Sequence, residues 1–221
     1  MTADTELVRS VLAEQVKERL LQDIFAGRYP PESRIVETRV AKELGISQAP
    51  VREALRGLEA LGLIEILPFR GARVRRPSAD EMRDAYLVRT ELEVLGARLG
   101  VPKMTDDDLA DLDDLYARMR KAATKKDRHA VATADTKFHE RLLSLAGNHA
   151  LERVWRSLEP YQRTYITLVA PGANEQWTAN LHTPVIDALH KRDARLVAEA
   201  LRHHFEEATA RLLEGWDGRR T

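Results

Sequence analysis

The apolar residues of this 221-residue chain recur mainly with the period of an α-helix. Near the start, apolar residues recur at every fourth position, namely Leu12, Val16, Leu20 and Ile24. Gly27 follows them as a signal that the helix ends. The second half keeps this period and predicts helices at about 79–99, 105–124, 127–146, 149–169, 181–192 and 193–216. The pattern therefore predicts a mainly α protein.

Residues 37–61 read as a helix, a turn and a second helix. The first helix is expected over about 37–44 and ends at Gly45, whose backbone tolerates the turn. The second begins after Ser47, a good N-cap, and reaches about residue 61. Buried faces are expected from Val40, Ala41, Leu44, Ile46, Val51, Leu55 and Leu58. Gln48 and Arg52 stand where a recognition helix presents side chains to the major groove of DNA.

Two short runs with β character follow, at 63–67 and 72–74. The two runs predict a hairpin, because turn-forming residues bound them. These are Gly62, Pro68, Gly71 and Pro77. The hairpin carries a basic cluster suited to phosphates or to the minor groove, made of Arg70, Arg73, Arg75 and Arg76. The segments together predict a winged helix. The alternative is a three-helix structural module with a solvated basic tail.

A domain boundary is expected at Pro77-Ser78. Ser78 with Glu81 has the spacing of a capping box that starts a helix, and Thr105 with Asp108 starts the next helix in the same way. No strand is predicted beyond this boundary. We therefore expect a winged helix-turn-helix domain at 1–77 and an all-α antiparallel helical bundle at 78–221.

Composition narrows the class of protein. Hydrophobic residues make up 43% and charged residues 32% of the chain, as in globular proteins. The absence of cysteine excludes disulfides and thiolate metal sites. No apolar run is long enough for a transmembrane helix, and the N-terminus lacks a signal-peptide core. We therefore expect a cytoplasmic protein with no membrane partner.

The net charge of zero hides an uneven distribution. Residues 1–77 hold 13 basic and 11 acidic side chains, whereas residues 78–221 hold 22 and 24. Within residues 34–76, nine basic side chains stand against five acidic ones, an excess of four. Neutrality therefore does not exclude DNA binding, and the basic surface is expected to be local.

Specific motifs occur within residues 10–76, namely Ala41-x-x-Leu44-Gly45-Ile46-Ser47, Pro50-Val51-Arg52-Glu53-Ala54-Leu55, Gly62-Leu63-Ile64 and Arg70-Gly71. With them this region resembles the DNA-binding domain of the GntR family of bacterial transcription regulators. The resemblance implies a DNA face of Ser47, Gln48, Ala49, Pro50 and Arg52, with Arg70 and Gly71 at the wing tip. Many relatives have Arg-Thr in place of Gln48-Ala49, which alters base preference. Arg39 is expected to offset this through a phosphate or base contact.

The second half contains a set of inward-facing polar residues. Asp135 and His139 lie one helical turn apart on a side shared with apolar residues. His182 lies beside a core-facing stripe, and His204 faces inward while His203 faces outward among glutamates. Three histidines and one aspartate suit zinc, nickel, manganese or iron, and the alternative is a set of ordinary polar networks. Surface or capping roles are expected for His129, His149 and His190.

Further motifs are Arg89-x-x-Leu92-Glu93, Asp135-x-x-Phe138-His139, Gly147-Asn148, His182-x-x-x-Ile186-x-Ala188-Leu189 and the His204 segment. With them, residues 78–218 look like the FCD ligand-binding domain of FadR-type GntR regulators. In the metal-binding branch of that subgroup, the resemblance implies a divalent metal held by Asp135, His139, His182 and His204. Zinc or nickel is placed ahead of manganese or iron. A small carboxylate or sugar acid is implied as the effector.

Candidate effector residues lie on two of the predicted helices. Arg89 is a candidate partner for a carboxylate, and the alternative of equal weight is a surface salt bridge with Glu93. Tyr161, Arg163 and Tyr165 lie on one later helix and are expected to line the same cavity.

The expected function is that of a sequence-specific DNA-binding repressor. It would bind a palindromic operator as a homodimer, and an organic acid at the metal would shift the population of DNA-binding states. One alternative is a metalloregulator that responds to the metal itself. Another is a metal-dependent hydrolase, which the attached DNA-binding domain disfavours. We therefore expect that the chain is not an enzyme.

Overall fold

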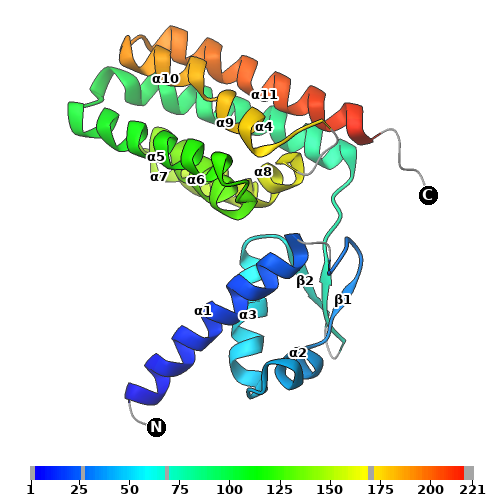
Figure 1. Ribbon diagram of the computed structural model, residues 1–221. Helices are drawn as coiled ribbons and strands as arrows, with labels where there is room; N and C mark the ends of the chain where they lie inside the picture. The colour runs from blue at the N-terminus through cyan, green and yellow to red at the C-terminus, as the bar shows by residue number, and fades with distance from the viewer. Residues whose placement is uncertain (1–2, 26–27, 68–69, 169–171, 217–221) are drawn as a thin grey trace. The chain divides into compact units, whose positions relative to one another are not determined.

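A computed structural model describes residues 3–25, 28–67, 70–168 and 172–216. It divides the chain into two compact units, residues 1–76 and 77–221. Figure 1 colours the first unit from blue to cyan and the second from green to red. The signals expected at Gly27 and Pro68 lie outside the described residues.

Three helices form most of the first unit, namely α1 Ala3–Phe25, α2 Glu37–Leu44 and α3 Gln48–Ala60. Helices α1 and α2 both pack on α3. Helix α2 ends at Gly45, whose φ of 67° lies in the left-handed region. Ser47 is the N-cap of α3, although its side chain makes no capping hydrogen bond. The helix-turn-helix prediction is confirmed to within one residue at each boundary.

A three-stranded antiparallel sheet completes this unit, with strands β1 Arg34–Ile35, β2 Ile64–Leu67 and β3 Gly71–Val74 in the order β1-β3-β2. The predicted hairpin is formed by β2 and β3, with Glu65 opposite Arg73 and Ile66 opposite Ala72. Strand β1 is missing from the sequence prediction because two residues are too few to show an alternating pattern. Together with the three helices, the sheet makes a winged helix.

The second unit consists of α4 Ala79–Gly100, the 3₁₀ turn Val101–Lys103, α5 Asp106–Thr124, α6 Arg128–Ser144, α7 His149–Ser157, α8 Pro160–Leu168, α9 Glu175–Asn180, α10 Thr183–His190 and α11 Ala194–Trp216. Capping boxes at Ser78–Glu81 and Thr105–Asp108 are confirmed. Helix α6 packs against α4, α5 and α8, and α4 packs along α11, as Figure 1 shows. The apolar core around α6 includes the fully buried Met82, Met119, Phe138, Leu142 and Trp155.

Two predicted helices differ in the structure. The expected helix 149–169 is two helices, because Glu159 takes a φ of 53° and Pro160 starts a new one. The expected helix 181–192 begins at Thr183, and the short α9 precedes it without having been predicted. The fold class is confirmed as mainly α, with an N-terminal winged helix-turn-helix and a C-terminal helical bundle. No described helix combines the length and apolar character that a membrane crossing requires.

Candidate metal centre and nucleic-acid interface

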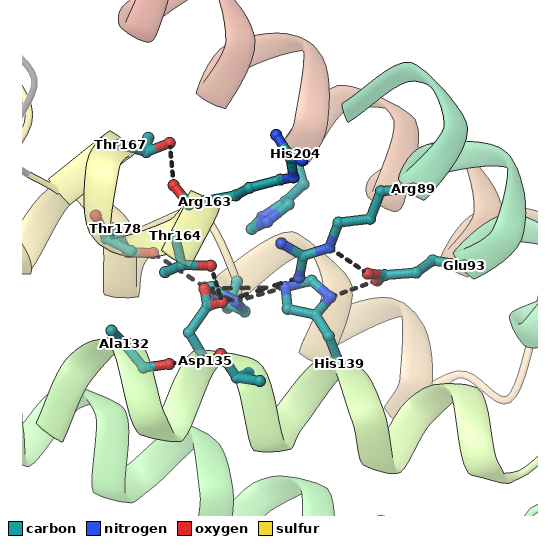
Figure 2. Close-up of polar contacts among 12 residues, drawn as sticks. Arg89, Glu93, Ala132, Asp135, His139, Arg163, Thr164, Thr167, Thr178 and His204 are labelled. Atoms are coloured by element: carbon teal, nitrogen blue, oxygen red, sulfur yellow. Dashed lines mark hydrogen bonds and ion pairs between the residues drawn. The ribbon is translucent and has the colours of Figure 1, made fainter. Parts of the chain in front are cut away.

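Four buried side chains from three helices converge inside the second unit. Asp135 and His139 project from one side of α6, His182 is the N-cap residue of α10, and His204 lies on α11. One ligand atom from each of the four lies within 4.8 Å of the others. Figure 2 shows Asp135 and His139 rising from α6 toward His204. The helical period thus selected His204, which is 5% exposed, over the exposed His203.

The shortest separations in this cluster involve the imidazole Nε2 atoms. Nε2 of His139 lies 3.1 Å from Nε2 of His182. Nε2 of His182 lies 3.2 Å from Oδ1 of Asp135, and Nε2 of His139 lies 3.9 Å from the same oxygen. Because the ligand atom of His204 also lies within 4.8 Å of the other three, the four side chains surround a common centre.

Each histidine of the cluster is held from behind through its other ring nitrogen. Nδ1 of His182 donates to the carbonyl of Thr178 at 3.0 Å, and Nδ1 of His204 donates to the carbonyl of Leu181 at 3.3 Å. Because a carbonyl only accepts, each Nδ1 carries the hydrogen and leaves Nε2 with a free lone pair in the neutral ring. Such outer partners orient metal-binding histidines.

His139 is held by a carboxylate instead of a carbonyl. Its Nδ1 donates to Oε2 of Glu93 at 2.5 Å. Burial by itself would raise the pKa of Glu93, but the contacts with His139 and Arg89 outweigh it and lower the pKa to about 2. Glu93 is therefore ionised at neutral pH and accepts the Nδ1 hydrogen. Nε2 of His139 is then left to face the cluster as a lone pair.

The lone pairs on the Nε2 atoms and on the Asp135 carboxylate repel one another at these short distances unless a positive charge lies among them. Burial lowers the pKa of His139 and lowers that of His204 well below its ordinary value, so both rings are neutral at pH 7. Burial opposes the charge of Asp135, yet its contacts with His182, His139 and Arg89 lower its pKa as well. A cation at the centre removes this repulsion. The donor set of three nitrogens and one oxygen fits a divalent transition metal.

Further polar side chains surround the cluster. Oγ1 of Thr164 on α8 donates to Oδ2 of Asp135 at 2.7 Å. Nε1 of Trp155 donates to Oε1 of Glu93 at 2.7 Å, and Nε of Arg89 donates to the same oxygen at 2.7 Å. The roles of Thr164 and Trp155 were not predicted, since no sequence periodicity relates them to residues on other helices. For the ion pair of Arg89 and Glu93, the sequence did give a signal, because the two residues lie four positions apart on α4.

Arg89 is buried beside the cluster, not exposed. It does pair with Glu93, but both side chains are 1% exposed, so the predicted surface salt bridge is an interior one. Its Cζ lies 4.8 Å from the centroid of the Phe205 ring. Its Nη2 lies 3.9 Å from Oδ2 of Asp135 and has no hydrogen-bond partner among the described residues. An unpaired buried N–H is costly, so this atom is suited to an added acceptor.

A cavity opens between the cluster and helices α8, α9 and α11. Its empty volume is about 280 Å³, part of which is open to solvent. The lining comprises Tyr86, Arg89, Asp135, Thr164, Thr167, Trp177, Thr178, Leu181, His204, Phe205 and Ala208. Arg89 thus lines one cavity together with Asp135 and His204, two residues of the cluster.

Tyr161 and Arg163, which were predicted to line the effector cavity, lie elsewhere in the structure. They are not among the described residues that line the cavity, and neither is Tyr165. The hydroxyl of Tyr161 lies 2.6 Å from Nδ1 of His129. Nε of Arg163 donates to the carbonyl of Leu158 at 2.5 Å, because the break before α8 turns this side chain back along the chain. The described lining of the cavity therefore does not include the predicted side chains of Tyr161 and Arg163.

The predicted DNA-binding residues of the first unit lie on α2, on α3 with its preceding turn, and on the wing. Ser47, Gln48 and Ala49 are exposed at the start of α3. Pro50 is buried, because it turns its ring into the core at the first turn of the helix. Exposed arginines on α2, α3 and the wing flank these residues, namely Arg39, Arg52 and Arg70.

Glycine is required at the wing position next to Arg70. Gly71 has a φ of 85°, and a Cβ there would lie 2.6 Å from the carbonyl oxygen of Ile35 on β1. A larger residue would therefore strain the backbone and displace β1. Behind the wing tip, Arg73 is tied by ion pairs to Glu65 and Glu32, so it is less available to DNA than its predicted role requires.

Comparison with known proteins agrees with this architecture. The family model "Bacterial regulatory proteins, gntR family" matches residues 12–74, and the FCD domain model matches residues 84–207. A protein of Paenarthrobacter nicotinovorans named "Probable D-xylose utilization operon transcriptional repressor" is 33% identical over 198 residues, 90% of this chain and 87% of that protein.

Two further likenesses extend over most of the chain. The "Galactonate operon transcriptional repressor" of Escherichia coli (strain K12) is 26% identical over 215 residues, 87% of this chain and 93% of that protein. The solved structure of E. coli McbR/YncC matches with a TM-score of 0.70 at 22% identity, over 92% of this chain and 97% of that chain. Such relatives are regulators and not enzymes, as predicted for this chain.

Proposed function

Because the chain belongs to the gntR family of bacterial regulatory proteins and carries an FCD domain, we propose that it is a transcriptional repressor controlled by a small carboxylate. The carboxylate binds beside a divalent metal ion in the second unit. The observation that carries this proposal is that Arg89, whose buried Nη2 has no hydrogen-bond partner among the described residues, lines a cavity together with Asp135 and His204. Two relatives named as repressors support the regulatory part.

The metal would be held by Asp135, His139, His182 and His204. Zinc and nickel suit these nitrogen and oxygen donors first, and manganese and iron come next. Bound there, the metal would supply a Lewis-acidic position for an oxygen ligand. The protein supplies the orientation, because Glu93 and the carbonyls of Thr178 and Leu181 hold the three imidazoles.

Charge favours an anionic effector. With neutral imidazoles, the buried site contains one positive group, Arg89, and two negative groups, Glu93 and Asp135, so its net charge is −1. A divalent ion changes this to +1, which attracts a monocarboxylate. The free N–H groups on Nη2 of Arg89 can donate to the carboxylate while Nε remains bound to Glu93. A small acid suits this cavity, whose lining brings Arg89, Asp135 and His204 together.

Operator recognition would involve a homodimer. A two-fold dimer places two winged helices on a palindromic site, and the carboxylate shifts the population between states that differ in DNA affinity. Helix α4 supports a dimer because it exposes large apolar side chains, Leu87, Val88, Leu95 and Leu99. Ser47, Gln48, Ala49, Arg52, Arg39 and Arg70 would contact DNA in each protomer. A protein that binds operator DNA in a bacterium would act in the cytoplasm.

The test is operator binding by the full-length protein at fixed salt, with an operator selected from a random duplex library. Affinity is measured with zinc alone, and then at saturating zinc with acetate, D-galactonate or the uncharged sugar D-xylose. We expect at least a tenfold change in affinity with a carboxylate and zinc together, and none with D-xylose. A response to zinc alone, with no effect of any acid, would instead identify a metal sensor.

A matched pair of variants locates the response. His204→Ala should remove the effect of the carboxylate while leaving operator binding without effector unchanged. His203→Ala, one residue away and exposed, should behave as the wild type. An unaltered carboxylate response in His204→Ala would contradict a role of the metal cluster.

A further inference from the structure

A forked ion pair joins the two helices of the helix-turn-helix. Glu37 is the first residue of α2, and Arg52 lies on α3, fifteen residues later. Nη2 of Arg52 donates to Oε1 of Glu37 at 2.7 Å, and Nε donates to Oε2 at 3.1 Å. Both carboxylate oxygens are thus engaged by one edge of the guanidinium. This contact fixes the plane of the guanidinium as well as its position.

The edge that Glu37 occupies determines which edge remains for a ligand. A guanidinium offers five N–H groups in a fixed plane, and the carboxylate takes the edge formed by Nε and Nη2. The edge formed by Nη1 and Nη2 is left, and no described residue pairs with Nη1. The Arg52 side chain is 56% exposed, whereas that of Glu37 is 19% exposed. The Glu37 side chain is therefore the more buried partner of the pair. The free edge of the guanidinium lies on Arg52, the more exposed partner.

That free edge has the geometry that guanine requires. Guanine presents O6 and N7 as two adjacent acceptors in the major groove, and one arginine can donate to both. We propose that Glu37 is a positioning residue that holds Arg52 ready to read a guanine through Nη1 and Nη2. The inference rests on the proposed function, in which Arg52 lies on DNA. It adds a specificity-determining role for an acidic residue that does not itself contact a base.

The neighbouring ion pairs of Arg39 and Arg73 do not combine these features. Arg39 pairs with Glu43 one turn away on the same helix, through Nε alone, and both side chains are largely exposed. Arg73 is shared between two glutamates on the sheet side. The pair of Glu37 and Arg52 differs because it is bidentate, spans two helices and has a mostly buried carboxylate.

The proposal predicts a signature that a charge effect alone would not produce. A carboxylate near DNA repels phosphates, so its removal strengthens binding to every sequence equally. A positioning role predicts in addition that the preference for one base pair falls. Glu37 thus lowers affinity for DNA in general while raising selectivity for a guanine.

The experiment begins with the full-length wild type and a random duplex library, which yields an operator. Arg52→Ala identifies the base pair whose preference depends on Arg52. Affinities of wild type, Glu37→Gln and the control Glu43→Gln are then measured at constant salt for the four possible pairs at that position. We expect a wild-type preference for guanine of about tenfold or more. Glu37→Gln should reduce it at least threefold, and Glu43→Gln should leave it unchanged.

A double variant separates positioning from a general structural role. In the Arg52→Ala background, Glu37→Gln should not change base preference, because no arginine is left to position. If Glu37→Gln alone keeps the full wild-type preference, this inference is overturned while the role of Arg52 stands. If Arg52→Ala changes no preference at any position, the proposed DNA contact of Arg52 is wrong. Thermal melting of each variant by circular dichroism confirms that the compared proteins are folded.

Discussion

At the scale of single residues, Glu93 links the parts of the candidate site. Its carboxylate accepts hydrogen bonds from His139, Arg89 and Trp155, which come from three different helices. It therefore sets the tautomer of an imidazole that we propose as a metal ligand, and it holds the arginine that lines the cavity. Figure 2 shows this carboxylate between Arg89 and His139.

Replacing Glu93 should weaken metal binding without removing a ligand. In Glu93→Gln the amide binds His139 less strongly, so we expect a loss of about 10–100-fold in zinc affinity. Competition with a chromophoric zinc chelator measures it. Glu91→Gln is the matched control, since Glu91 lies on the same helix and is exposed. Equal affinities in Glu93→Gln and the wild type would show that Glu93 does not support the site.

At the scale of elements, the break between α7 and α8 shapes the site. In a continuous helix over 149–169, Thr164 would lie further along the same axis, away from Asp135. Instead, the left-handed Glu159 and the following Pro160 redirect the chain, and α8 then packs on α6. Thr164 reaches Asp135 as a result of this change of direction.

The turn into the wing depends on a glycine in a comparable way. Gly71→Ala should destabilise the first unit, because the left-handed φ costs about 1–2 kcal/mol for alanine and the Cβ meets the carbonyl of Ile35. Gly45→Ala is the control, since Gly45 has a similar φ of 67° but open space around it. Urea unfolding should show a larger loss of stability for Gly71→Ala. Equal losses of stability in the two variants would mean that β1 can shift to make room for the Cβ.

At the scale of the whole molecule, metal binding should stabilise the folded chain. The ligands come from α6, α10 and α11, so the unfolded chain does not assemble them. Free zinc at 100 times its dissociation constant should add about 2.7 kcal/mol to the free energy of unfolding. Calorimetry with and without zinc measures the effect. His182→Ala should abolish it and His190→Ala, on the exposed end of α10, should not; stabilisation that persists in His182→Ala would contradict the site.

The oligomeric state is a second property of the whole molecule. Helix α4 exposes Leu87 at 68% and Leu95 at 44%, on the surface that we assign to the dimer. The double variant Leu87→Glu/Leu95→Glu should be monomeric, because burial of the two charges opposes association. Light scattering after size exclusion gives the mass. Val154→Glu, at a similarly exposed apolar position on α7, should remain dimeric, and a dimeric double variant would place the interface elsewhere.

The sequence by itself determined the features that depend on neighbours within a few residues. Hydrophobic period and turn residues located α2 and α3, and the spacing of Ser78 and Glu81 identified the start of α4. The same period distinguished the inward His204 from the outward His203. These outcomes follow from backbone geometry, which relates residues one helical turn apart.

Only the tertiary structure decided which distant residues meet. It brought Asp135 and His182 to 3.2 Å, buried Arg89 with Glu93, and turned Tyr161 and Arg163 away from the cavity. No local pattern encodes these results, because they depend on how α4, α6, α8, α10 and α11 pack. Side-chain packing between helices sets their rotation and separation, and a shift of one turn would separate the four ligands. Local periodicity can thus show that a polar residue faces inward, while the packing of the helices determines what it meets there.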